Sequence, residues 1–493
     1  MAFGELSMLQ VTEGAQETVR RGEWMRVLSE AVGQLDEWED QWPGFEQRLG
    51  VDSDDAAEAI SKLAGRLEQN LPYFHPLYAG HMLKPPHPVA WAAYALTMLV
   101  NPNNQTREVG EATTEMELEV VDRLAKMLGF SDGYLGHLTT SGTIANLEAM
   151  WIARETHPDK AIACSKAAHY NYSRIANLLG VRLVSVPTRA DETINAQALA
   201  EVLAGEDVGT VVVTLGTTGL GVVDPLDEVL EVVREHSRAP SSDTTSGPVR
   251  IHVDAAYGGF FALLADGEHP EVDASAFSAL GDVDSITIDP HKHGLQPYGC
   301  GCILFRDGQV ATHYDHDSPY TYLERDSLHM GQIQLECSRS GAAAGALWAT
   351  LEALPLERDR GLGPLLSSCR NAALGWAQAI DESPCLRLVV PPHLDIVSFG
   401  VWPRLNSVVR ASDVTRWTER ILELGAGDEE LPFYLTRYDI DCETAVRFWP
   451  DLQADAPSVS VLRSCMMKPE HEAWWITLHS RVSETAWDVL EEE

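Results

Sequence analysis

One lysine, Lys292, constrains what this chain can be more than any other residue does. It lies in the segment SITIDPHKHGLQPYGCGCILF (285–305), between His291 and His293, after a β-rich run and before glycine-rich apolar sequence. Burying an ammonium beside a strand is costly. The position is reasonable if the amine is needed neutral, as a nucleophile toward an aldehyde. We therefore interpret Lys292 as a reactive amine; the alternative is a solvated lysine whose aliphatic stem alone is covered.

A second chemical signal, Asp254, lies upstream in the segment IHVDAAYGG (251–259). Pyridoxal 5'-phosphate (PLP) requires a lysine that binds its aldehyde and an acidic partner for its pyridine nitrogen. Asp254 ends a predicted strand, which is where open α/β sheets place their ligands. By itself Asp254 would be interpreted as a residue that caps a turn, but together with Lys292 it indicates a PLP site.

These two segments resemble the group II PLP-dependent amino-acid decarboxylases, which include aromatic amino-acid, glutamate, tyrosine and aspartate decarboxylases. The resemblance covers most of the chain. Further motifs follow in the family's order: HPLYAGHM (75–82), NPNNQ (101–105), TTSGTIANLEAMW (139–151), AHYNYSR (168–174), TLGTTGLG (214–221) and ECSRSG (336–341). The resemblance implies fold type I of the PLP-dependent transferases, which is an α/β fold with a large, mostly parallel, seven-stranded sheet.

The hydrophobic pattern favours the same fold class. We predict strands at 210–215, 249–254 and 285–288, and helices at 114–128 and 225–236. Thr114 and Glu117 form a capping-box pattern that would open the first helix. The apolar stripe of that helix would contain Leu118, Val121, Leu124 and Leu128. Strands that alternate with helices indicate a parallel sheet covered by helices.

We expect three domains: a helical N-terminal segment (1–110), a large PLP-binding α/β domain (111–378) and a small C-terminal α+β domain (379–493). In the first, helical periodicity covers 24–35, 56–71 and 89–99. In the family this segment packs against a partner subunit, so the resemblance implies a homodimer. An ordinary helical subdomain is the alternative. The composition of 239–248 predicts a flexible surface loop.

The resemblance also assigns the cofactor contacts. Lys292 would bind PLP covalently, Asp254 would keep the ring nitrogen protonated, and His169 would stack on the ring. The other contacts would come from Ala256 on the opposite ring face, Gly142 and Thr143 at a helix N-terminus that suits a phosphate, Thr218, Asp289 and His291. Asp289 stands where many members have Asn, and His293 where many have Trp or Met, which leaves the choice of substrate open.

The residues that would contact the substrate are inferred from the resemblance alone. Tyr78 and His81 would line the pocket, and Arg339 matches a family arginine. In the family a tyrosine on a mobile loop protonates the substrate Cα after CO2 leaves. The corresponding loop, roughly 312–334, contains Tyr314, Tyr320 and Tyr322. Spacing from Lys292 favours Tyr320 or Tyr322, and we prefer Tyr322; a packing role for either is the alternative.

Composition excludes several other classes. A formal net charge of −38 argues against nucleic acid and anionic membranes as partners. The eight cysteines are scattered and form no disulfide framework. We interpret Cys300-Gly-Cys302 as buried strand residues, with no metal site, because no second ligand pair is visible. The longest apolar stretch, 89–100, is too short to span a bilayer, and no signal-peptide pattern is visible. We expect a cytoplasmic protein.

The sequence thus predicts a PLP-dependent decarboxylase that converts an L-amino acid to its amine and CO2. The negative charge of the chain would repel a dianionic substrate, which favours an aromatic one such as tyrosine. Two alternatives remain: an acidic substrate (aspartate or glutamate), or decarboxylation coupled to oxidative deamination that yields an aldehyde. PLP transamination or a non-catalytic role for the scaffold would fit the paired Lys292 and Asp254 motifs less well.

If Tyr322 donates the proton at Cα, Tyr322→Phe should keep decarboxylation while the amine yield falls and aldehyde and ammonia rise. The change removes one hydroxyl and keeps the ring, so packing is preserved, and Tyr320→Phe is the matched second variant. Amine, aldehyde and ammonia are quantified together with CO2. Wild-type amine yield with no aldehyde in both variants would place the donor elsewhere.

Overall fold

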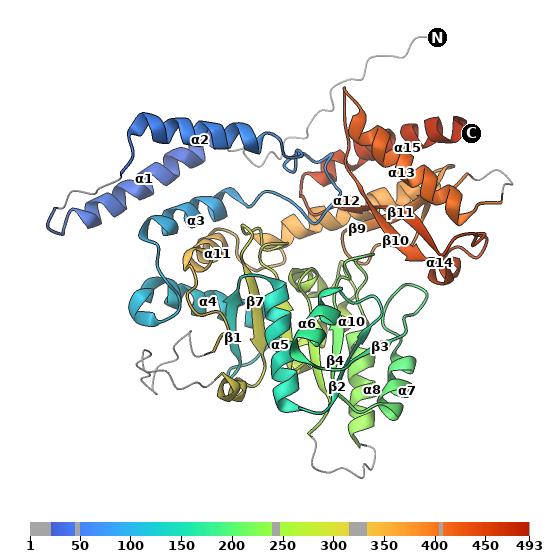
Figure 1. Ribbon diagram of the computed structural model, residues 1–493, viewed down its shortest axis with the longest axis horizontal. Coiled ribbons are helices and arrows are strands. Elements are labelled where there is room, and N and C mark those ends of the chain that lie inside the picture. Colours follow the sequence, from blue (N-terminus) through green and yellow to red (C-terminus); the bar gives the residue numbers. More distant parts are fainter. Residues whose placement is uncertain (1–20, 45–49, 239–246, 315–332, 404–407, 493) are drawn as a thin grey trace.

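A seven-stranded sheet forms the centre of the larger domain (Figure 1). The computed structural model describes residues 21–44, 50–238, 247–314, 333–403 and 408–492. The strand order is β1-β7-β6-β5-β4-β2-β3, and only β7 among these strands runs antiparallel to its neighbours. The strands are β1 (Leu135–Thr139), β2 (Ala161–Ser165), β3 (Leu183–Val186), β4 (Val208–Thr214), β5 (Arg250–Asp254), β6 (Ser285–Ile288) and β7 (Gly301–Phe305). The predicted fold class is confirmed.

Helices cover this sheet, so its central strands are almost entirely buried. The strand β4 reads VGTVVVT and is buried along its whole length, as expected for a parallel strand covered on both faces. The helices are α4 (Glu111–Met127), α5 (Gly142–Thr156), α6 (Asn171–Leu179), α7 (Ala196–Gly205), α8 (Leu226–Arg238), α9 (Ala262–Ala265), α10 (Ala274–Ser278) and α11 (Ala342–Ala353). Short 3-10 turns are η1 (Arg107–Val109), η2 (Gly259–Phe261), η3 (Leu280–Asp282) and η4 (Gly308–His313).

Most of the elements predicted for this domain are confirmed. The strands expected at 210–215, 249–254 and 285–288 are β4, β5 and β6, and the helix expected at 225–236 is α8. Cys302 lies in β7 and Cys300 directly before it, both buried, as predicted. The predicted surface loop lies largely outside the described residues.

The predicted start of α4 is wrong. The helix begins at Glu111, its N-cap is Gly110, and no side chain caps it. Thr114 is buried inside the helix, and Leu118 is 39% exposed rather than part of the buried stripe. The carboxylate of Glu117 accepts instead from the backbone N–H of Leu138 (2.9 Å), from Asn104 Nδ2 (2.7 Å) and from Arg339 Nη2 (2.6 Å). These three donors, which come from other parts of the fold, engage the Glu117 carboxylate, so it does not cap the helix.

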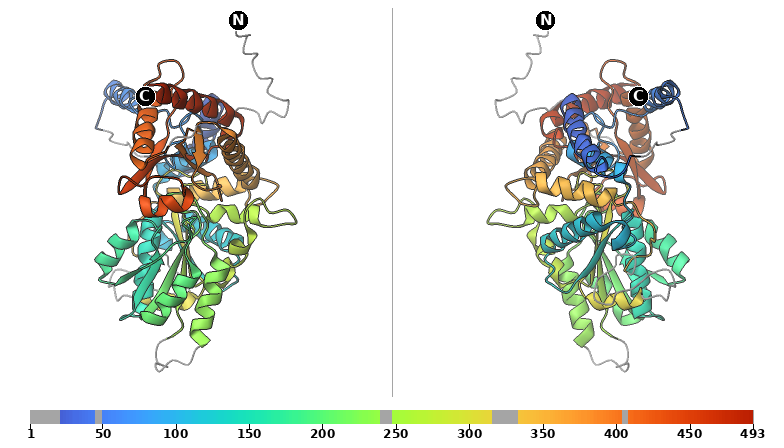
Figure 2. Two further views of the ribbon diagram at one scale, coloured as in Figure 1. Left: turned by 90° about the vertical axis from the view of Figure 1, so that its right-hand side faces the viewer. Right: turned by 90° about the vertical axis from the view of Figure 1, so that its left-hand side faces the viewer.

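A smaller domain carries a four-stranded antiparallel sheet of order β10-β11-β9-β8. Its elements are α12 (Leu362–Glu382), β8 (Leu386–Leu388), β9 (Ile396–Val401), α13 (Ala411–Gly427), β10 (Thr436–Asp441), α14 (Cys442–Phe448), β11 (Ser458–Cys465) and α15 (His471–Glu491). The two domains are stacked, as the turned views show (Figure 2). The boundary expected at 378/379 falls inside α12, which packs its first turns on the large core and Trp376 on the small one.

Three N-terminal helices complete the described chain, and all three predicted helices are confirmed. They are α1 (Arg21–Glu39), α2 (Ser53–Leu67) and α3 (Pro88–Val100). The helix α3 packs on α11, and α1 packs on α3. The pair α1 and α2 lies at the edge of the molecule (Figure 1). Although α3 is strongly apolar, none of the helices in the described ranges is long and apolar enough to cross a membrane.

Glu117→Ala should lower the free energy of unfolding by about 3–5 kcal/mol, because it leaves the Arg339 guanidinium buried without its anion. Urea unfolding followed by circular dichroism measures the change. The control is Glu115→Ala on the same helix, whose exposed ion pair with Arg107 contributes about 0–1 kcal/mol. Equal losses in both variants would contradict the importance of the buried pair.

Candidate active site

A cavity of about 250 Å³ opens at the carboxyl ends of the parallel strands. Residues that follow β2, β4, β5 and β6 reach it together with the N-terminus of α5, because parallel strands end at one edge of the sheet. Its wall includes every residue predicted to contact the cofactor: Gly142, Thr143, His169, Thr218, Asp254, Ala256, Asp289, His291 and Lys292. The fold therefore brings together side chains from five separate motifs.

The carboxylate of Asp254, at the end of β5, is held by three donors. Asn146 Nδ2 donates to it at 3.0 Å, the Tyr172 hydroxyl at 3.1 Å and the Ala256 N–H at 3.2 Å. Burial, and then Asp254 itself, raise the pKa of Tyr172, so its hydroxyl keeps the proton that it donates. These three bonds fix the orientation of the Asp254 carboxylate at the cavity.

A second layer orients the amide of Asn146. Burial lowers the pKa of His252 to about 4, so its ring is neutral at physiological pH. The ring Nε2–H donates to Asn146 Oδ1 at 3.0 Å, and the Ser285 hydroxyl lies 2.9 Å from Nδ1. With its oxygen engaged in this way, Asn146 must turn its NH2 group toward Asp254.

Lys292 lies on the turn that follows β6. Its backbone N–H donates to the Asp289 carbonyl, and its Nζ lies 3.2 Å from Asp289 Oδ2. On the same turn, His291 Nδ1 lies 2.8 Å from the Cys300 carbonyl and Nε2 lies 3.5 Å from Asp289 Oδ2. Burial lowers the pKa of His291. The amine is thus presented to the cavity beside a buried carboxylate.

The residue after Lys292, His293, faces away from the cavity and contacts both domains. Its Nδ1 lies 3.1 Å from the Tyr257 carbonyl and its Nε2 lies 2.8 Å from Asp395 Oδ2. The ring therefore contacts the large domain through one nitrogen and the small domain through the other. Burial by itself raises the pKa of Asp395, but His293 and the Tyr257 hydroxyl outweigh it and hold that pKa below its usual value. This ion pair anchors the lysine turn to the segment before β9.

The N-terminus of α5 provides free amides at the cavity. Ser141 caps the helix by accepting from the Ile144 N–H at 3.3 Å. The N–H groups of Gly142 and Thr143 donate to no acceptor in the described part of the chain. A Cβ on Gly142 would lie 2.6 Å from Asp289 Oδ2, so glycine is required here. Amides of this kind, at the positive end of a helix, suit a phosphate.

These groups fit PLP: a lysine amine, a carboxylate held by three donors, a histidine ring and free helix amides surround one cavity. A family model described as the pyridoxal-dependent decarboxylase conserved domain matches residues 48–401. The chain belongs to this family. It is a PLP-dependent amino-acid decarboxylase.

Known relatives agree on the reaction and differ in substrate. The chain is 31% identical over 326 residues (65% of this chain, 82% of the relative) to a probable L-tyrosine/L-aspartate decarboxylase of Methanothermobacter thermautotrophicus. It is 29% identical over 345 residues (70% and 84%) to an L-aspartate decarboxylase of Thermococcus kodakarensis. Among solved structures, Oryza sativa TDC with PLP and tryptamine resembles it with a TM-score of 0.72 at 17% identity, covering 95% of this chain and 99% of that one.

Of the residues predicted for the substrate side, the described ones, Tyr78, His81 and Arg339, do not line this cavity. The Tyr78 hydroxyl lies 2.6 Å from His81 Nδ1, and burial raises the pKa of Tyr78 to about 12. Arg339 is paired with Glu117. Tyr320 and Tyr322 lie outside the described residues. The roles of all five in substrate binding or protonation stay predictions.

Tyr314, the remaining tyrosine of the predicted loop, is buried in the large domain. Its hydroxyl donates to Glu148 Oε2 at 2.8 Å, and its ring packs edge-on against Trp151. The Glu148 carboxylate also lies 3.0 Å from His137 Nε2. This environment supports a packing role for Tyr314, consistent with the preference for Tyr320 or Tyr322 as the proton donor.

The sequence analysis missed one charged residue that contacts a segment of the cavity wall. Arg463 on β11 is 7% exposed, and its Nε donates at 2.8 Å to the carbonyl of Gly219, the residue after Thr218. Its Nη2 has no hydrogen-bond partner in the described ranges. The available signal was an arginine in the otherwise apolar run VSVLRSC.

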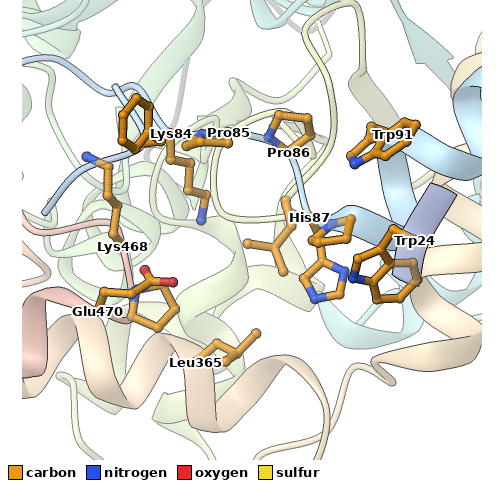
Figure 3. A pocket seen from close by; sticks show the side chains of 13 residues that line it. Trp24, Lys84, Pro85, Pro86, His87, Trp91, Leu365, Lys468 and Glu470 are labelled. Carbon is orange, nitrogen blue, oxygen red and sulfur yellow. The ribbon is translucent and has the colours of Figure 1, made fainter. Parts of the chain in front are cut away.

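A larger cavity, of about 690 Å³, lies at the base of the N-terminal helices (Figure 3). Trp24, Trp91 and a run of prolines form one wall, and Lys84, Lys468 and Glu470 form the other (Figure 3). Burial lowers the pKa of Lys468 to about 8. None of the cofactor residues lines it, so size alone does not mark the catalytic cavity.

Asp254→Asn should reduce turnover by at least about 100-fold, the usual effect of removing one electrostatic group from a catalytic site. It should also weaken PLP retention, because a neutral amide does not stabilise a protonated ring nitrogen. The rate of amine release measures turnover, and the PLP that stays bound after dialysis against PLP-free buffer measures retention. The matched variant Tyr172→Phe removes one hydrogen bond but keeps the charge, and should cost about tenfold or less. An active Asp254→Asn enzyme would contradict the assignment.

Proposed function

We propose that this decarboxylase acts on an aromatic L-amino acid such as tyrosine and releases the corresponding amine and CO2. The observation that carries this choice is the charge of the cavity wall. Two carboxylates, Asp254 and Asp289, face the cavity, against one lysine, Lys292. The described lining offers no arginine and no second lysine for a substrate's second carboxylate, and the net charge of −38 adds long-range repulsion. An uncharged aromatic side chain meets neither cost.

The residue roles follow from their positions. PLP, when bound, supplies the electron sink for the electrons left by departing CO2. Lys292 would hold the cofactor and later exchange with the substrate amine. Asp254 would keep a proton on the ring nitrogen, and His169 would cover one ring face. The amides of Gly142 and Thr143 would hold the phosphate.

Arg463 is the candidate for the substrate's α-carboxylate. Its buried Nη2 is unsatisfied, and a guanidinium suits a carboxylate through paired hydrogen bonds. It is fixed by the Gly219 carbonyl next to the cavity residue Thr218. Arg463 would satisfy its own hydrogen bonds only when a carboxylate is present, which favours amino acids over amines as ligands.

The named relatives support a second candidate, an acidic substrate, because one of them is an L-aspartate decarboxylase. Such a substrate needs another cation for its side chain. Formation of an aldehyde by oxidative deamination is a further alternative, and it depends on the loop tyrosines Tyr320 and Tyr322.

Amine release screened over the twenty standard amino acids should show tyrosine or another aromatic residue with kcat/KM at least about tenfold above aspartate and glutamate, a difference of about 1.4 kcal/mol. Lys292→Ala should abolish release with every substrate while the far-UV circular dichroism stays unchanged. A preference for aspartate would favour the second candidate. Full activity of Lys292→Ala would refute the role of this lysine.

We also propose that the enzyme is a homodimer whose N-terminal helices contact the partner subunit. The helix α2 is amphipathic, yet none of its residues is buried. Its apolar side chains Ile60, Leu63 and Leu67 are 66%, 51% and 58% exposed. A contiguous apolar face of this kind indicates a protein contact. A second copy of the chain is the occupant that the family resemblance implies.

Burial of these side chains in a dimer would contribute about 1.5–3 kcal/mol each. Ile60→Asp combined with Leu63→Asp should therefore shift the protein toward monomer in sizing chromatography with light scattering. Ser61→Asp, on the same exposed helix, adds charge without touching the apolar face and should leave the dimer intact. A stable, fully active wild-type monomer would refute the proposal.

A further inference from the structure

The side chain of Asp289 occupies an unusual position in the cofactor cavity. It is 3% exposed, and its Oδ2 lies 3.2 Å from Lys292 Nζ and 3.5 Å from His291 Nε2. Its Oδ1 has no hydrogen-bond donor in the described part of the chain. A buried carboxylate oxygen without a donor is costly. This oxygen requires a partner that the described residues do not supply.

The same carboxylate lies against the first turn of α5. A Cβ built on Gly142 would be 2.6 Å from Oδ2 and 2.7 Å from Oδ1 of Asp289. The free N–H groups of Gly142 and Thr143, which suit a phosphate, belong to this turn. A phosphate bound there is a dianion at neutral and alkaline pH, and it would share a small cavity with the Asp289 carboxylate. Two anions at this separation disfavour each other's charged form.

Few groups can balance this negative charge. The titratable residues around Asp289 are His291, Lys292, Tyr298, Cys300 and Cys302. Burial raises the pKa of Tyr298 and of both thiols, so these three remain uncharged. The Lys292 amine is the nearest basic group, 3.2 Å from Asp289 Oδ2, but it would be committed to the covalent bond with the cofactor. His291 is then the one basic group left beside Asp289 in the described ranges.

The hydrogen-bond pattern of His291 determines where a proton can go. Its Nδ1 faces the Cys300 carbonyl and therefore carries hydrogen. Its Nε2 faces Asp289 and is free to share a second proton with that carboxylate. A proton held by this pair would satisfy the carboxylate and remove its charge beside the phosphate.

We propose that cofactor binding takes up one proton from solvent onto the Asp289–His291 pair. The proton resides on Asp289 or on His291 Nε2, and no electrons are transferred; the covalent attachment at Lys292 is a separate condensation of amine and aldehyde that releases one water. PLP should consequently bind more weakly as the pH rises, because the deprotonated pair repels the phosphate. The inference rests on the cofactor placement proposed above and adds a pH-dependent step to it.

Isothermal titration calorimetry of the apoenzyme with PLP tests this directly. The titration is run at pH 8 in two buffers that differ in ionisation enthalpy and contain neither phosphate nor a primary amine. The dependence of the heat on the buffer gives the number of protons taken up. Asp289→Asn is the matched variant, because its amide has the same shape, carries no charge and can donate a hydrogen bond. Both proteins are also titrated in a Lys292→Ala background, because Lys292 Nζ lies 3.2 Å from Asp289 Oδ2 and its covalent step would otherwise release different numbers of protons in the two proteins.

The wild type should take up roughly one proton more per cofactor than Asp289→Asn. Its Kd for PLP should rise by up to about tenfold per pH unit between pH 7 and 9, the limit for one linked proton, while that of the variant rises less. Asp289→Ser replaces the variant if Asp289→Asn does not fold. Equal proton uptake and equal slopes would overturn the inference while leaving the cofactor site intact. Absence of PLP binding to every protein would refute the cofactor placement as well.

Discussion

The site depends on one constraint: strands β2, β4, β5 and β6 are parallel, so all of them end at the same edge of the sheet. The residues that follow these ends come from motifs far apart in the chain, yet they meet around one cavity. The helix α5 follows β1, which is parallel to β6 across the antiparallel β7, so its N-terminus points to the same edge. Without this arrangement, the lysine, the aspartate and the phosphate-binding amides would not share a ligand.

Burial of charge is the main cost of such a site, and the chain offsets it with nested hydrogen bonds. Asp254 is held by Asn146 and Tyr172, and Asn146 is in turn oriented by the neutral ring of His252. Behind the lysine turn, Asp395 balances His293. Each charge has a specific partner, so the catalytic groups keep their geometry in a low-dielectric interior. Asp289 is the exception, since one of its oxygens has no protein donor in the described ranges.

The small domain contributes two charged side chains to the surroundings of the site. Asp395 reaches the lysine turn from the segment before β9, and Arg463 on β11 binds the Gly219 carbonyl, next to the cavity residue Thr218. Both belong to the small domain, and the helix α12 of this domain packs on both hydrophobic cores. The position of the small domain therefore affects Lys292 and the proposed carboxylate site together. This coupling offers a physical route by which substrate binding and the lysine turn can influence each other.

The motifs around Lys292 and Asp254 predicted the cofactor from the sequence, and the resemblance to the decarboxylase family proposed His169 and Gly142 as further contacts. The structure brings these residues around one cavity, because each of them lies at a strand end or a helix start. The contacts that sequence reasoning missed join distant residues. Glu117 leaves its predicted capping role for Arg339, 222 positions away, and His293 pairs with Asp395, 102 positions away. The exposed face of α2 and the unpaired Nη2 of Arg463 likewise became visible only in three dimensions. Hydrophobic periodicity and capping patterns report the free energy of local structure, whereas the partner of a buried charge is chosen by which donors the tertiary fold brings within hydrogen-bond distance.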